Sequence, residues 1–133
     1  MHTTLKIAAA ALLIVGSQAV HAYGSSPSSG HCEKPVFSEF QPATNKYLQS
    51  FNEFSFLASS NTTAKSIEIS VSAGSIKYHL TYKDLEIDTQ KSGRYEVSGK
   101  LPRPIEQGFA RVSITAHSKP GCERTEGYLI RIH

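Results

Sequence analysis

The sequence has no tryptophan, no long hydrophobic run and little excess of charge of either sign. Antibody-type domains carry a buried tryptophan, so its absence excludes that type. The longest apolar run covers residues 7–15, far short of the roughly 20 residues that span a bilayer, so we expect no membrane insertion. The sequence also lacks a Gly-x-Ser-x-Gly motif, a paired Cys–His signature and a phosphate-binding glycine loop. We therefore expect no enzymatic activity.

The first 22 residues have the pattern of a secretory signal peptide. His2 and Lys6 give a weakly basic start, the apolar run follows, and Val20-His21-Ala22 ends in a small-x-small pattern. We therefore predict cleavage after Ala22 and an exported protein, either periplasmic or secreted. Residues 23–31 are rich in serine and glycine and are expected to form a flexible leader.

The charge balance of the exported chain is mild. Removing Lys6 with the signal peptide leaves 14 − 1 = 13 basic residues against 11 acidic ones, a net charge of about +2. Nucleic acid and anionic membranes attract proteins with a much stronger basic excess, so neither is an expected partner. The sequence predicts no oligomeric state.

What the sequence does contain is apolar–polar alternation with a period of two, which is typical of strands that bury one face. Residues 109–117 alternate in this way, residues 127–133 repeat the pattern, and a Pro-Gly pair between them indicates a hairpin. Seven strands are predicted, at residues 34–40, 51–59, 66–71, 76–82, 94–98, 109–117 and 127–133. No segment has a helical period, so we predict one antiparallel β-sandwich over residues 32–133, with a small barrel as the alternative.

The same alternation predicts which side chains form the core. Ser113, Thr115, Arg111 and Arg131 occupy outward positions and are expected to remain unburied. The residues expected to be buried are Phe54, Phe56, Ile67, Ile69, Val112, Ile114, Tyr128 and Ile130.

Cys32 and Cys122 are the two cysteines of the chain and lie near opposite ends of the exported sequence. In an exported protein, an even number of cysteines favours a disulfide. In an immunoglobulin-like sandwich, Cys32 precedes the first strand and Cys122 lies between the last two, which brings both to one end of the domain. The expected bond therefore needs no distortion of the sandwich.

An outward face of the sandwich is the candidate binding site. Strands 66–71, 76–82, 109–117 and 127–133 usually share a sheet in this architecture, and Glu68 also points outward there. Such a mixed, mildly basic face suits a protein or glycan partner, although an ordinary solvated face has the same pattern. The candidate partner-binding residues are Lys77, His79, Arg111, His117 and Arg131.

Two metal sites are conceivable from the sequence. His31 and His117 are both expected at the disulfide end, where imidazole would suit copper or zinc. The preferred interpretation is two exposed histidines beside an ordinary disulfide, with no metal and no cofactor. The alternating acids Asp84, Glu86 and Asp88 could bind Ca²⁺, but a charge-protected edge strand explains them more simply.

Asn61-Thr62-Thr63 has the form of an N-glycosylation sequon. It would matter only in a source that glycosylates its exported proteins.

Several stretches follow one another in a familiar order: Ser66-Ile-Glu-Ile-Ser-Val, Arg94-Tyr-Glu-Val, Leu101-Pro, Gly108-Phe-Ala-Arg-Val-Ser-Ile-Thr-Ala and Tyr128-Leu-Ile-Arg-Ile. This order resembles the bacterial immunoglobulin-like (E-set) modules over most of residues 34–133. The resemblance implies an immunoglobulin-like sandwich that acts as an adhesive or binding module.

A weaker resemblance is to the periplasmic copper-resistance protein family CopC, which has the same kind of sandwich. That family begins its mature chain with histidine and carries Asp-Gly-His in the turn between the last two strands. Here the expected mature chain begins at Tyr23, and the turn reads Pro120-Gly121-Cys122. The resemblance therefore implies the fold without the copper ligands. We expect a small exported binding module, with a periplasmic copper-handling protein as the alternative.

Overall fold

The computed structural model describes residues 31–133, and the predicted signal peptide and residues 23–30 of the predicted leader lie outside this part. The chain forms two compact units, Met1–Cys32 and Glu33–His133. His31 and Cys32 are the described residues of the first unit, and the second unit is the sandwich. Within residues 31–133, no helix is long and apolar enough to cross a membrane.

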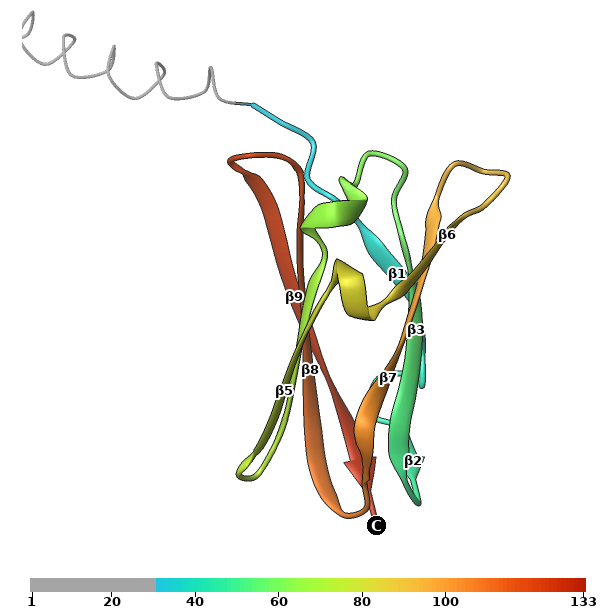
Figure 1. Cartoon of the computed structure of the whole chain (residues 1–133), viewed down its shortest axis with the longest axis vertical. Coiled ribbons are helices and arrows are strands. Elements are labelled where there is room, and N and C mark those ends of the chain that lie inside the picture. The colour runs from blue at the N-terminus through green and yellow to red at the C-terminus, as the bar shows by residue number, and fades with distance from the viewer. Residues whose placement is uncertain (1–30) are drawn as a thin grey trace, which may run out of the picture. The chain divides into compact units, whose positions relative to one another are not determined.

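The second unit consists of two β-sheets that face each other (Figure 1). Hydrophobic side chains pack between the two sheets. The strands are β1 (Phe37–Gln41), β2 (Tyr47–Leu48), β3 (Phe51–Ala58), β4 (Glu68–Ala73), β5 (Ile76–Thr81), β6 (Glu86–Thr89), β7 (Tyr95–Ile105), β8 (Gly108–Lys119) and β9 (Cys122–Ile132). Two short 3-10 helices, η2 (Ala64–Ser66) and η3 (Tyr82–Asp84), connect strands. The predicted all-β, immunoglobulin-like sandwich is confirmed.

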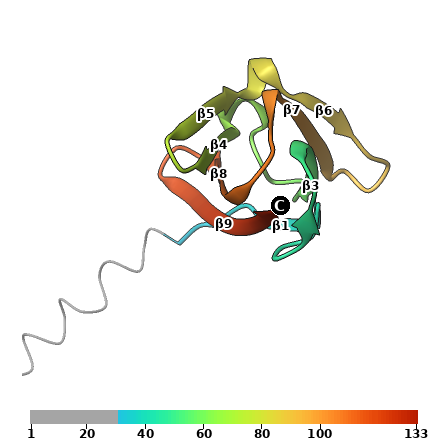
Figure 2. The ribbon, with the colours of Figure 1, turned by 90° about the horizontal axis from the view of Figure 1, so that it is seen from below.

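The sheet orders place the predicted binding strands together. One sheet has the order β1-β3-β7-β6 and the other has the order β2-β9-β8-β4-β5. Figure 2 shows the two layers from below, with β5, β4, β8 and β9 forming one wall. The prediction that the third, fourth, sixth and seventh strands share a sheet is therefore correct.

The closing hairpin of β8 and β9 is the longest antiparallel pairing in the sandwich. Pro120 and Gly121 form its turn, and Gly121 adopts a φ of 88° that favours glycine. The last strand begins at Cys122 rather than at residue 127 as predicted. Residues 123–126 are polar and give no apolar alternation, but they pair with β8, and the Thr115 and Thr125 hydroxyls lie 2.9 Å apart.

The fifth predicted strand, 94–98, is also longer than expected, because β7 continues through the Leu101-Pro-Arg-Pro segment that was predicted to be a connection. Strand β6 pairs only with residues 95–98 of β7. Beyond that point one side of β7 has no neighbouring strand within the described part of the chain, so Pro102 and Pro104 remove no hydrogen bond from a β6 ladder.

Strand β2 was missed, because residues 42–49 were predicted to be turn and loop. Tyr47 and Leu48 pair in parallel with Arg131 and Ile132 of β9. Backbone hydrogen bonds hold this short segment in place, including one from the Arg131 amide to the Lys46 carbonyl at 2.9 Å. Two residues are too few to show a period of two.

The acidic segment was predicted to be a ragged, charge-protected edge, and β6 is indeed an edge strand. Asp84 ends η3, where its carboxylate accepts a hydrogen bond from the Thr81 amide at 2.9 Å. Because this carboxylate satisfies a backbone amide at the start of the helical turn, Asp84 has a structural role.

The core between the sheets contains all eight residues that were predicted to be buried. Ile67, Ile69, Val112, Ile114 and Ile130 are completely inaccessible to solvent. The four side chains that were predicted to remain unburied, on β8 and β9, are indeed not buried. This agreement fixes the register of the central strands, because a shift of one residue would move every side chain to the opposite face.

One glycine in β7 is required by close packing. A Cβ atom on Gly99 would lie 2.5 Å from Phe54 and 2.9 Å from Leu85, so no larger residue fits without displacing the core. Cys32 and Cys122 are disulfide-bonded, as predicted. Cys122 is fully buried at the first position of β9.

Candidate binding face

The five candidate partner-binding residues all lie on the outer face of the five-stranded sheet. Lys77 and His79 come from β5, Arg111 and His117 from β8, and Arg131 from β9. Pairing between the strands arranges the outward side chains in rows that cross the sheet. The rows differ in chemistry from one end of the face to the other.

The row at the end opposite the disulfide is aromatic and contains three residues in register, Tyr47 of β2, Arg131 of β9 and Phe109 of β8. The Arg131 guanidinium lies 5.4 Å from the Tyr47 ring centre and 5.9 Å from the Phe109 ring centre, within reach of a cation–π interaction with both. It also donates a hydrogen bond to the Tyr47 hydroxyl at 3.2 Å. We call these three residues the aromatic row.

The two aromatic side chains of the aromatic row are unusually exposed. Tyr47 is 60% exposed and Phe109 is 59% exposed, although both side chains are large and apolar. The His133 ring lies 5.2 Å from the Tyr47 ring and extends the group. Together with Gly108 and Ile132, these residues line a hollow of about 160 Å³. Within residues 31–133, the Arg131 Nε atom is buried and has no hydrogen-bond partner.

The next row along the face is cationic. Lys77 of β5, Ser72 of β4, Arg111 of β8 and Leu129 of β9 lie in register across four strands. Lys77 and Arg111 are exposed, and neither forms an ion pair with any residue of the part that the structure describes. We call Lys77, Arg111 and Leu129 the cationic row.

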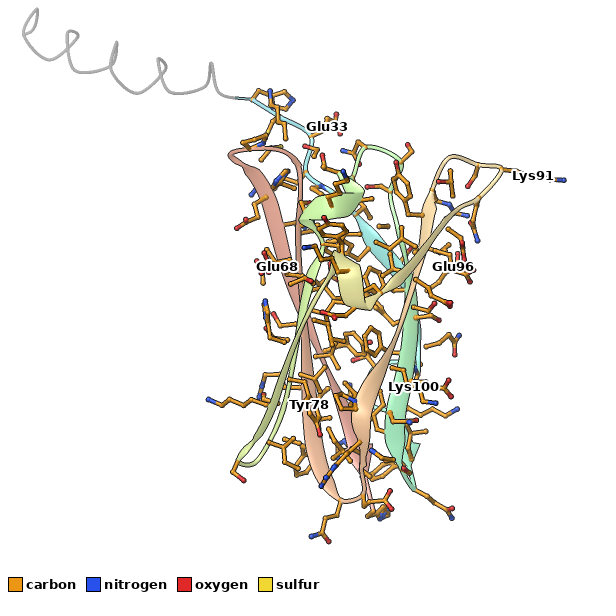
Figure 3. The ribbon with its side chains drawn as sticks, in the orientation of Figure 1. Glu33, Glu68, Tyr78, Lys91, Glu96 and Lys100 are labelled. Carbon is orange, nitrogen blue, oxygen red and sulfur yellow. The ribbon has the colours of Figure 1, made fainter. Side chains whose placement is uncertain are left out.

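The acidic side chains of the face lie farther toward the disulfide end. Glu68 of β4 points away from the core (Figure 3), and its carboxylate lies 3.3 Å from the Nε2 atom of His79. The Nδ1 atom of His79 lies 3.3 Å from the Ser70 hydroxyl. His79 therefore belongs to a local polar pair and is separated from the aromatic row by the cationic row.

His117 lies at the disulfide end of β8, where its backbone is held by η2. Its amide donates a hydrogen bond to the Ser66 hydroxyl at 3.0 Å, and its carbonyl accepts one from the Thr63 amide at 2.9 Å. The Nδ1 atom of its ring is buried and has no hydrogen-bond partner within residues 31–133. His117 thus shares a sheet face with the other four candidates but lies at the far end from the aromatic row.

The described residues do not fit a resident copper centre. Among residues 31–133, no three histidine, cysteine, aspartate or glutamate side chains converge. Both cysteines are disulfide-bonded, and the single methionine of the chain is Met1. His31 is exposed and belongs to the first unit. Asp84, Glu86 and Asp88 do not form a Ca²⁺ site either.

Asn61 of the sequon-like triplet has a structural role. Its side-chain amide donates a hydrogen bond to the Glu33 carbonyl at 3.0 Å, and its oxygen accepts one from the Ser59 hydroxyl. These bonds hold the segment that precedes β1.

Two of the three aromatic-row residues were not predicted from the sequence. Phe109 occupies an outward position of a predicted strand, so its size at a solvent-facing position was a usable signal. Tyr47 had no such signal, because its position beside Arg131 depends on the pairing of β2 with β9.

Solved structures share this fold. PcoC, a methionine-rich copper resistance protein from Escherichia coli, matches with a TM-score of 0.53 and 14% identity, covering 76% of this chain and 100% of PcoC. CopC from Methylosinus trichosporium OB3b matches with a TM-score of 0.54 and 12% identity, covering 74% of this chain and 92% of CopC.

No family model matches the sequence, and no curated protein matches it significantly. At these identities the structural likeness establishes the fold alone. It confirms the resemblance to the copper-resistance sandwich.

Proposed function

We propose that this chain is an exported, non-enzymatic binding module that holds a protein partner through the aromatic row. The observation that carries this proposal is the Arg131 guanidinium between two exposed aromatic rings. Tyrosine and arginine are enriched among the residues that dominate the energy of protein interfaces. A disulfide persists in oxidising compartments, which supports export.

The geometry of the aromatic row suits binding because it is already ordered. Arg131 and Phe109 lie on two central strands, and Tyr47 is fixed by the pairing of β2 with β9. Ordering flexible side chains at an interface costs about 0.5–1.5 kcal/mol each, and side chains that already pack against one another avoid part of that cost. Burial of the two exposed rings by a partner would add an apolar contribution.

Site-specific photo-crosslinking tests the location of the binding site. A photoreactive phenylalanine analogue is placed at position 109, and the matched control carries it at Lys100 on β7 in the opposite sheet (Figure 3). We expect a discrete crosslinked product from position 109 alone in cells that export the chain. The partner that is captured in this product is then purified. The Arg131→Ala variant of the chain should bind this partner at least tenfold more weakly than the wild-type chain does. Equal products from both positions, or none from either, would contradict the proposal.

Copper handling is the second candidate function, and the observation that favours it is the structural likeness to CopC and to PcoC, of which PcoC is a copper resistance protein. The residues that the sequence offers for it are His31 and His117. No third ligand converges with them among residues 31–133. Two imidazoles alone make a weak site, since tight sites need three or four ligands with supporting partners.

We therefore predict that the exported chain has no stoichiometric, submicromolar Cu²⁺ site. The measurement is titration calorimetry at neutral pH in a weakly coordinating buffer. A tight site that is abolished by His31→Ala or His117→Ala, but retained in the control His133→Ala, would replace the first candidate with the second.

A further inference from the structure

Resting on the proposed function, we propose that the partner presents an acidic polypeptide segment, whose carboxylates bind the cationic row while its apolar side chains cover the aromatic row. The two rows are adjacent on the sheet, because Arg131 and Leu129 follow one another on the outer side of β9, as Phe109 and Arg111 do on β8. One extended segment can therefore contact both.

The charges of this part of the face are unbalanced. Arg131, Arg111 and Lys77 lie in two neighbouring rows, and none of them is ion-paired with any residue in the described range 31–133. No acidic residue occupies an outward position in either row. Complementary potentials determine partner choice and association rate at interfaces, so this surface selects an acidic partner.

The acidic residues of the outer face lie away from the cationic row and do not neutralise its charge. Glu68 lies opposite Thr115 and is engaged with His79. Glu123 lies opposite His117 at the disulfide end of the hairpin. Ser70, Ser113 and Gly127 separate both acids from the cationic row. The outer face therefore has a basic, apolar end and an acidic end.

The apolar residues favour a polypeptide over an acidic glycan. Leu129 lies beside Arg111 in the cationic row, and Ile76 is 41% exposed at the nearby β4–β5 turn. Aliphatic side chains such as these pack against apolar peptide side chains, whereas a uronic acid polymer offers mainly hydroxyls and carboxylates. The combination of guanidinium, aromatic and aliphatic groups matches a segment with both acidic and apolar residues.

Selection from a displayed library of random twelve-residue peptides on the full exported chain tests the chemistry of the partner. Peptides enriched on the wild-type protein, and depleted on Phe109→Ala, should contain an excess of aspartate and glutamate together with aromatic or aliphatic residues. An array of acidic oligosaccharides, including oligogalacturonate, is probed in parallel.

An enriched peptide is then measured by fluorescence anisotropy at several salt concentrations. Arg111→Gln and Lys77→Gln should each weaken binding by about three- to tenfold at low salt and reduce the salt dependence, because exposed charges are screened over about 10 Å at 0.1 M salt. Arg103→Gln, on the opposite sheet, is the matched control and should leave the affinity unchanged. Replacing the glutamates of the peptide by glutamine should abolish the difference in peptide affinity between the wild-type chain and these two variants.

The results of the peptide selection and of the oligosaccharide array can contradict the acidic polypeptide partner without contradicting the binding face. Enrichment of uncharged peptides that still require Phe109 would overturn the acidic specificity and leave the binding face in place. Glycan binding without peptide enrichment would overturn the polypeptide in favour of an acidic glycan. Enrichment that is the same on Phe109→Ala and on wild type would overturn both proposals.

Discussion

At the scale of single residues, Tyr128 stands out because its hydroxyl group is buried. The side chain is 8% exposed, its ring lies 4.7 Å from that of Phe40, and the hydroxyl oxygen has no hydrogen-bond partner within residues 31–133. Burial of an unsatisfied hydroxyl costs about 1–3 kcal/mol in proteins.

We therefore expect Tyr128→Phe to stabilise the sandwich by about 1 kcal/mol at neutral pH, because it removes that hydroxyl and keeps the ring. The measurement is the urea midpoint of unfolding. Tyr95→Phe, a half-buried tyrosine of β7, is the control and should leave the midpoint nearly unchanged. A loss of stability in Tyr128→Phe would indicate that the hydroxyl has a partner in solution.

The same hydroxyl predicts a loss of stability at alkaline pH. Burial raises the pKa of Tyr128 from 10.0 to about 12. The folded state then holds the hydroxyl proton of Tyr128 more tightly than the unfolded state does. The resulting contribution to the free energy of unfolding is fully present below pH 10 and is lost between about pH 10 and pH 12. A rise of the pKa from 10.0 to about 12 corresponds to about 3 kcal/mol of stability. Unfolding of wild type and Tyr128→Phe across this range should show a decline that the variant lacks.

At the scale of elements, β8 is the central strand of the five-stranded sheet, and its register determines which of its side chains face the core. Ile114 is fully buried and its neighbour Ser113 is half-buried on the outer face. Ile114→Ala should lower the free energy of unfolding by about 2–5 kcal/mol, and Ser113→Ala should change it by less than about 0.5 kcal/mol. The two urea midpoints measure this contrast. Equal shifts for both variants would mean that the register of β8 in solution differs from the one described.

At the scale of the whole molecule, the disulfide between Cys32 and Cys122 closes a loop that contains strands β1 to β8 and leaves β9 outside. A loop of about 90 residues corresponds to a stabilisation on the order of 4–5 kcal/mol in the chain-entropy model, before native strain is subtracted.

Reduction should therefore lower the urea midpoint strongly, and thiol labelling of the unreduced, denatured protein should modify neither cysteine. The doubly substituted chain, with Cys32→Ala and Cys122→Ala, is the control, and the reductant should leave its midpoint unchanged. Labelling of both cysteines before reduction would contradict the bond and strengthen the metal-handling candidate.

The sequence by itself determined which side chains face the core and that the chain forms a sandwich. The alternation around Ile114 and Ile130 marks the buried face of each strand, because successive side chains of a strand point to opposite sides. The same period placed Lys77, Arg111 and Arg131 on one outward face. It also predicted the hairpin turn at Pro120-Gly121.

Only the tertiary structure decided which strands lie side by side and where they end. Alternation shows the face to which a residue points, but it contains no information about its neighbour on the next strand. The aromatic row depends on such neighbours, because Tyr47 reaches Arg131 through a two-residue strand that has no detectable period. Likewise β7 runs through Pro102 and Pro104 because β6 ends before it reaches them, and that is a property of the sheet rather than of the local sequence.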